Sequence, residues 1–163
     1  MSFKEQEYRE IITKAVCGKG KKRFTCTDII EPSHMPTSVL GCWIINHCYE
    51  ASRKDEKTVE VTGSYDINIW YAYHDNTKTE VMTNTVHYQD KVKLEQRDHN
   101  CLNETEEVIV KVIRQPNCLD CKLSECKEKI IVSVEKEFLV QVIGETKVNV
   151  RIENDQNHHP HRK

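Results

Sequence analysis

The chain has 163 residues, a formal net charge of -2 and 31% charged residues, with only five glycines and four prolines. This length suits one domain or two small ones that share a core, and the charge gives no reason to expect a nucleic-acid partner. The charged first residues and the lack of a long apolar run predict a folded chain that is made and kept inside a cell, with no secretory signal and no membrane insertion.

The first elements are a flexible N-terminus over 1–8 and a strand pattern over 9–17, which the segment from Gly18 to Lys22 interrupts. These glycines lack the spacing and the Lys-Ser/Thr pair of a phosphate-binding loop, so they predict a plain turn. The strand pattern resumes over 23–31. A hairpin around the turn would place Cys17 and Cys26 near each other on facing strands.

The next strand, over 39–51, carries large apolar groups on both faces, which predicts a central strand. Trp43 and His47 share one face, and Cys42 and Cys48 share the other. We interpret Cys42 and Cys48 as buried thiols. His47 is interpreted as a structural or surface histidine, because neighbours in a strand point to opposite faces and cannot act as a Cys-His couple.

The stretch from Lys57 to Tyr73 alternates apolar and polar residues over its whole length, apart from Gly63. This period of two predicts a long strand with one packed face, and Gly63 is interpreted as a bend or bulge. A turn at 74–76 leads to another long strand over 77–94. The segment 95–106 is predicted to be a polar connection, and it holds Cys101.

The C-terminal part begins with a short strand over 107–114, which is apolar on both faces and is ended by 115–117 around Pro116. A segment over 118–123 and a loop around Cys126 follow. A second long strand is predicted over 129–143, with a turn at Gly144 and a last strand over 146–152. The histidine-rich tail over 153–163 has no reason to fold.

These elements predict an all-β fold that is antiparallel and resembles a β-sandwich, formed by one β-rich domain over 9–152. A weak internal similarity between 39–73 and 108–143 adds the hypothesis of two related β-sandwich halves, 9–100 and 101–152, that share a core. The side chains expected in the core are Trp43, Ile67, Ile69, Val132 and Phe138.

The sequence contains no HExxH, GxSxG, Rossmann or Walker motif, so we expect no enzyme and no cofactor. Cys118 and Cys121 form a CxxC pair that Cys126 follows. Three interpretations stay open: reduced thiols, disulfide cross-linking, and a zinc site with Cys118, Cys121 and Cys126 as weak candidate ligands. A fourth zinc ligand would come from Cys101, His99, His158, His159 or His161.

Four cysteines lie in or next to polar connections, where thiols are exposed and exchange. They are the candidates for cross-linking between chains: Cys101, Cys118, Cys121 and Cys126.

Six segments together resemble the outer spore coat morphogenetic protein E family of Bacillus-type endospore formers. They are YREIITKAV (8–16), SVLGCWIINHCYEA (38–51), YDINIWYAY (65–73), NTKTEV (76–81), EVIVKVIRQPNCL (107–119) and EKEFLVQVIGETKV (135–148). The similarity spans nearly the whole folded part of the chain.

The resemblance implies a β-rich structural scaffold made in the mother-cell cytoplasm during sporulation and then kept in the spore coat. Such a scaffold would self-associate as a homo-oligomer around the forespore, dock on the basement layer of the coat and recruit outer coat proteins. The alternative is a protein-interaction module whose β-domain is stabilised by zinc or cross-linked by disulfides. Oxidation of exposed thiols after mother-cell lysis would lock the scaffold in place.

Overall fold

The computed structural model describes residues 7–97 and 101–152, with the side chains of 96, 97 and 101–105 left aside. In these ranges it contains seven strands: β1 (Glu7–Ile30), β2 (Pro36–Arg53), β3 (Thr58–Tyr73), β4 (Lys78–Lys93), β5 (Gln96–Arg97), β6 (Cys101–Leu123) and β7 (Ile130–Ile152). No helix in the described part is long and apolar enough to cross a membrane.

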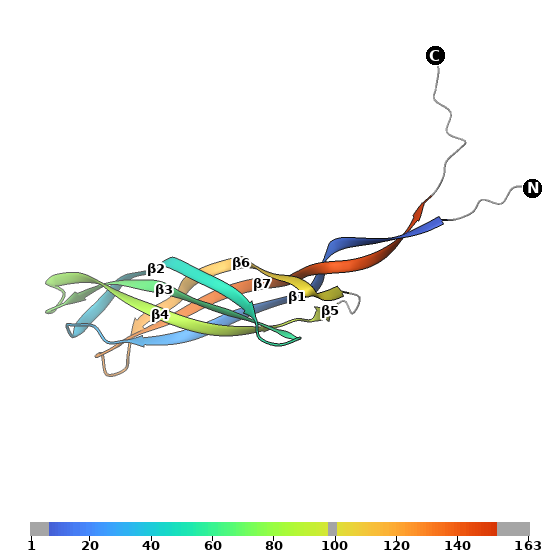
Figure 1. Ribbon diagram of the computed structural model, residues 1–163. Coiled ribbons are helices and arrows are strands. Elements are labelled where there is room, and N and C mark those ends of the chain that lie inside the picture. The colour runs from blue at the N-terminus through green and yellow to red at the C-terminus, as the bar shows by residue number, and fades with distance from the viewer. Residues whose placement is uncertain (1–6, 98–100, 153–163) are drawn as a thin grey trace, which may run out of the picture.

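The strands form two antiparallel sheets that pack face to face, a four-stranded sheet in the order β5-β1-β7-β6 and a three-stranded sheet in the order β2-β3-β4 (Figure 1). The prediction of an all-β, antiparallel, sandwich-like fold is therefore confirmed. β1 pairs with β7 from Glu7 opposite Ile152 to Ile30 opposite Ile130. The two hypothetical halves, 9–100 and 101–152, thus contribute strands to the same sheet.

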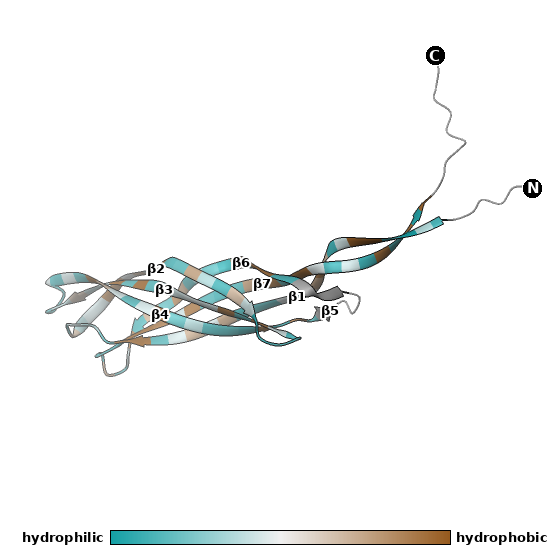
Figure 2. Ribbon diagram, viewed as in Figure 1, coloured by the Kyte–Doolittle hydropathy of each residue, from teal (hydrophilic) through white to brown (hydrophobic). Residues whose placement is uncertain are grey.

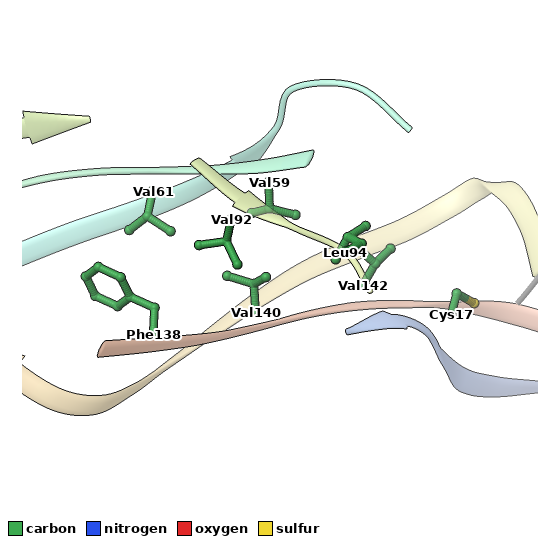
Figure 3. Close-up of a cluster of buried hydrophobic side chains, with 8 residues drawn as sticks. All are labelled: Cys17, Val59, Val61, Val92, Leu94, Phe138, Val140 and Val142. Atoms are coloured by element: carbon green, nitrogen blue, oxygen red, sulfur yellow. The ribbon is translucent and has the colours of Figure 1, made fainter. Parts of the chain in front are cut away.

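The core lies between β3 and β7, the inner strands of the two sheets. The alternating residues of β3 from Val59 to Tyr71 bury their apolar face, and those of β7 meet them from the opposite sheet. Figure 3 shows the part of this core around Phe138, whose ring lies close to Val61 of the facing sheet. Four of the five expected core residues are confirmed as fully buried: Ile67, Ile69, Val132 and Phe138.

Trp43 is the exception, since 43% of its surface is exposed. The expectation that its strand is central was wrong, because β2 is the edge strand of the three-stranded sheet. An irregularity between Ile45 and Cys48, with Asn46 at a φ of 57°, reverses the alternation within the strand. Trp43 and Ile45 therefore face outward, while the next residue of the same parity, His47, faces the other sheet.

The segment 18–22 is not a hairpin turn, and its Gly20 lies at a close contact with another strand. β1 runs through this segment without a break, with a bulge between Val16 and Gly18. A Cβ at Gly20 would lie 2.2 Å from the backbone oxygen of Lys93, so only glycine lets the end of β4 approach here. Cys17 and Cys26 consequently lie in different core clusters and do not face each other across a hairpin.

The segments of the C-terminal part that were predicted to be loops or turns between strands lie inside the continuous strands β6 and β7. β6 begins at Cys101 and passes through Pro116 with several register shifts, so 101–106 is not a loop and 115–117 does not end the strand. Likewise β7 passes through Gly144, which pairs with Ala15, and 144–145 is not a turn. Proline is tolerated in β6 because this strand lies at the sheet edge.

Gly63 lies within a regular β3–β4 ladder opposite Tyr88, and the bulge expected there is instead in β2. A Cβ at this position would lie 2.3 Å from the Cys48 backbone oxygen and 2.5 Å from the Tyr88 hydroxyl. Replacing Gly63 by alanine is therefore expected to reduce the free energy of unfolding by about 1–3 kcal/mol, as overpacking does.

Urea denaturation measures this change, and Gly41→Ala provides the matched control. A Cβ at Gly41 would meet its nearest neighbour, the Trp43 ring, at 3.7 Å, which is an ordinary contact. Equal denaturation midpoints for the two variants would show that Gly63 has no special role.

The first ten residues of β1 and the last residues of β7 continue beyond the sandwich as a two-stranded ribbon, which we call the arm (7–16 and 145–152). Figure 1 shows the arm projecting from one end of the body, with the start of β1 and the end of β7 at its tip. Apolar residues recur along it in Figure 2. They are exposed on both faces of the ribbon: Tyr8, Ile12 and Val16 on one, and Ile11, Val148 and Val150 on the other.

Candidate functional site

The predicted cross-linking cysteines differ in their exposure and in whether they lie in a strand or in a turn. Cys118 and Cys121 lie in strand β6 and are half-buried, whereas Cys126 lies in the β6–β7 turn and is exposed. The side chain of Cys101 lies outside the described part. Cys48 is exposed and Cys42 half-buried, which corrects the interpretation of both as buried thiols.

Three of these thiols meet between the two sheets. Cys42 of β2 forms hydrogen bonds with Cys121 and Cys118 of β6, beside the core cluster around Tyr65 and Val132. The contact with Cys121, together with burial, raises the pKa of Cys42, and the same contact lowers the pKa of Cys121. Burial raises the pKa of Cys118 to about 12. The CxxC pair therefore faces a third cysteine within the chain, which no sequence spacing indicated.

Cys126, by contrast, is held at the surface. Its sulfur lies 3.3 Å from the Ser124 hydroxyl, and this hydrogen bond lowers the pKa of the Cys126 thiol. Within residues 7–97 and 101–152, no three Cys, His, Asp or Glu side chains are arranged to hold a metal ion. The other proposed zinc ligands, His99, His158, His159 and His161, lie outside these ranges. Cys17 is disulfide-bonded and buried.

A polar cluster joins the two sheets beside the Phe138 ring. His47 Nδ1 lies 2.8 Å from the Gln115 side-chain oxygen, and His47 Nε2 bonds to the Tyr88 hydroxyl. Burial lowers the pKa of His47. Lys136 lies over the Tyr88 ring, 4.3 Å from its centroid, and pairs with Asp90 at 3.0 Å. His47 is thus a satisfied structural histidine, as expected from the sequence.

The outward face of the three-stranded sheet carries an apolar patch around Gly41. Trp43 and Trp70 are each 43% exposed and lie on either side of this glycine, and Ile45 and Val81 extend the patch. Sequence reasoning placed Trp43 in the core and so missed this surface. Large exposed apolar patches mark sites of interaction with other proteins.

The arm is the second surface that the sequence did not reveal, because the sequence of 7–16 and 145–152 predicts strands but does not show which neighbours cover them. β6 joins β7 only up to Thr146, opposite Cys101, and β5 pairs with β1 only at Gly18 and Lys19. Within residues 7–97 and 101–152, β1 from Arg9 to Val16 and β7 from Lys147 to Val150 therefore have no strand paired along their outer edges. Such edges are templates for pairing with another chain.

Comparison with known proteins gives one result for nearly the whole chain. No curated protein and no solved structure matches. The family model of the outer spore coat protein E (CotE) matches residues 7–163.

Proposed function

Because the chain belongs to the outer spore coat protein E family and is thus a spore coat protein, we propose that it is a non-enzymatic scaffold that assembles with copies of itself around the forespore. On this proposal it is made in the mother-cell cytoplasm, docks on the basement layer of the coat and holds outer coat proteins in place. The scaffold needs no cofactor.

The arm is the observation that carries this proposal. An isolated two-stranded ribbon is marginally stable in water, because it has no second layer or third strand to cover it. Here the ribbon exposes apolar side chains on both faces, with Ile12 at 58% exposure on one face and Ile11 at 42% on the other. A chain that keeps such a ribbon needs another chain to cover it, and a scaffold made of many copies provides one.

The apolar patch around Gly41 supports the second part of the proposal, the attachment of other coat proteins. It lies on the outward face of β2, β3 and β4, on a different element from the arm. Copies joined through their arms therefore leave the two tryptophans available to a different partner.

Electron microscopy and sedimentation of the purified full chain test self-assembly. At tens of micromolar, a scale at which unpaired strand edges associate, we expect large homo-oligomers both with and without reductant. A monodisperse monomer at this concentration would contradict the proposal.

We further propose that disulfides between chains form after assembly, through the candidates Cys101, Cys118, Cys121 and Cys126. Of these, Cys126 is best placed, since it is exposed and its lowered pKa raises the thiolate fraction at neutral pH. Cys118 and Cys121 face Cys42 within the chain and are expected to exchange more slowly.

Mild oxidation followed by non-reducing electrophoresis is expected to give ladders that collapse with reductant. Cys126→Ser should deplete the ladders yet leave the assemblies visible in the microscope, and Cys42→Ser is the matched control with a half-buried thiol. Because the pKa of Cys126 is lowered, ladder formation should begin at a lower pH than for an ordinary thiol, and Ser124→Ala should shift its onset upward. Ladders that are unchanged in Cys126→Ser would refute the assignment.

A further inference from the structure

The outer edge of β1 in the arm is long enough to accept a strand. From Arg9 to Val16 it pairs with β7 on one side, and in the described part the first residue after it that is paired on the other side is Gly18. Every one of these residues except Ala15 is exposed. A strand added along this edge would turn the marginal ribbon into a wider sheet.

The side chains on one face of this edge form a nearly symmetric series. Reading along β1, Tyr8, Glu10, Ile12, Lys14 and Val16 alternate with residues of the other face. Apolar residues occupy both ends and the centre, and opposite charges occupy the two positions between them. When two copies of this series run in opposite directions, apolar residues lie opposite apolar residues and each glutamate lies opposite a lysine.

Antiparallel pairing of this edge with a second copy restricts the choice of register. The backbone groups of alternate residues point to the free edge, so residues that face each other in two identical strands must have the same parity. With Ile12 opposite Ile12, Glu10 lies opposite Lys14 twice, and Tyr8 lies opposite Val16 twice.

The neighbouring registers are less favourable. A shift that centres the pairing on Glu10 or on Lys14 places like charges directly opposite each other, which destabilises a sheet. Centring on Ile11 or Thr13 places the charges of the series opposite apolar residues or outside the pairing. One register alone therefore matches both charge and apolarity along the edge.

We propose that two copies of this chain pair antiparallel through residues 8–16 of β1, with Ile12 on the two-fold axis and Glu10 of each copy opposite Lys14 of the other. This inference rests on the proposed self-assembly and names its first contact. The two arms then form one four-stranded sheet in the order β7-β1-β1-β7. A two-fold contact of this kind closes on itself, so larger assemblies need a second surface.

Charge reversal with mixing tests the register in full-length protein. In Glu10→Lys, both cross-strand pairs become Lys opposite Lys, and in Lys14→Glu both become Glu opposite Glu. Each variant alone is expected to self-associate about tenfold more weakly than the original chain, as like charges directly opposite require. In an equimolar mixture every pair is again of opposite sign, so association should recover.

Recovery on mixing separates the contact between chains from effects within one chain. Glu10 lies 3.4 Å from Lys147, and Lys14 pairs with Glu145 in the ladder, so each reversal also disturbs its own arm. In the mixture each variant keeps its own disturbed contact within the chain, so a recovery of association must come from the contact between chains. Arg9→Glu is the matched control, since it reverses a charge that the register places opposite Ala15, and it should associate like the original chain.

A second measurement uses the unaltered sequence and so does not depend on how the variants fold. A zero-length carbodiimide reagent joins a carboxylate and an amine that are in contact. Within one chain Glu10 and Lys14 lie about 13 Å apart along the strand, too far for this link. Mass spectrometry of a mixture of isotope-labelled and unlabelled chains is expected to show Glu10 joined to Lys14 between chains, with Glu10 joined to Lys147 within one chain as the internal standard.

Two results would show that the pairing is wrong while the proposed scaffold function stands. In the first, the original chain and both reversed variants assemble equally well. In the second, the original chain assembles, but mixing the variants does not restore association and no Glu10–Lys14 link between chains is found. If the original chain does not assemble at all, the proposed function fails with it.

Discussion

Replacing Phe138 by alanine is expected to lower the free energy of unfolding by about 3–5 kcal/mol. Phe138 is fully buried, and its ring packs 6.1 Å from Phe24 and 6.1 Å from Tyr88, measured between ring centroids. It also contacts the valines of the facing sheet, so truncation leaves a cavity between two rigid layers that cannot collapse to fill it. Urea denaturation at constant protein concentration measures the loss.

Trp43→Ala is the control for this prediction. It removes a larger side chain, but from the exposed outer face of β2, and surface substitutions typically change stability by no more than about 0.5 kcal/mol. If Trp43→Ala destabilised the protein as much as Phe138→Ala, the inward and outward faces of the sheets would have to be reassigned.

Replacing Lys136 by methionine is expected to cost about 3–5 kcal/mol, because it removes one partner of a buried ion pair. The Lys136 side chain is only 3% exposed, and its ammonium group lies 3.0 Å from the carboxylate of Asp90. The same group lies over the Tyr88 and Phe24 rings. Methionine fills a similar volume but leaves the Asp90 charge without its counter-ion.

The double variant Lys136→Met with Asp90→Asn separates this cause from lost packing. Removing both charges of a buried pair is often close to neutral. We therefore expect the double variant to unfold at a higher urea concentration than Lys136→Met alone. A double variant that is less stable than Lys136→Met would contradict the interpretation.

The alternation of apolar residues in β3 and β7 was enough to predict the fold class and the buried residues Ile67, Ile69, Val132 and Phe138, because both strands are regular in the parts that line the core. Trp43 was misplaced because a local irregularity at Asn46 reverses the faces of β2. The pattern of apolar and polar residues does not predict where the pairing of β2 with β3 shifts register. Apolar groups on both faces predicted a central strand, but the outer apolar face is a surface patch.

The surfaces that carry the proposals could not be predicted, since they depend on contacts between distant strands. Gly20 was interpreted as a turn, whereas it makes room for the Lys93 backbone of another sheet. Cys42 meets Cys118 and Cys121 only because β2 and β6 pack at the same side of the sandwich. Ile12 is exposed because its ribbon extends past the end of the facing sheet, which is a property of the whole fold.

Because β1 pairs with β7, the arm forms only after the last strand has been synthesised. The ribosome makes the chain from its N-terminus, and domains complete their folding as their segments emerge. β2, β3 and β4 are contiguous and can pair early, but β1 must wait for β7, whose contacts with it span nearly the whole sequence. A nascent chain therefore has no arm until β7 has been synthesised. On the proposed assembly through the arm, chains that still lack β7 cannot pair with other copies, so self-association waits for the last strand of the fold.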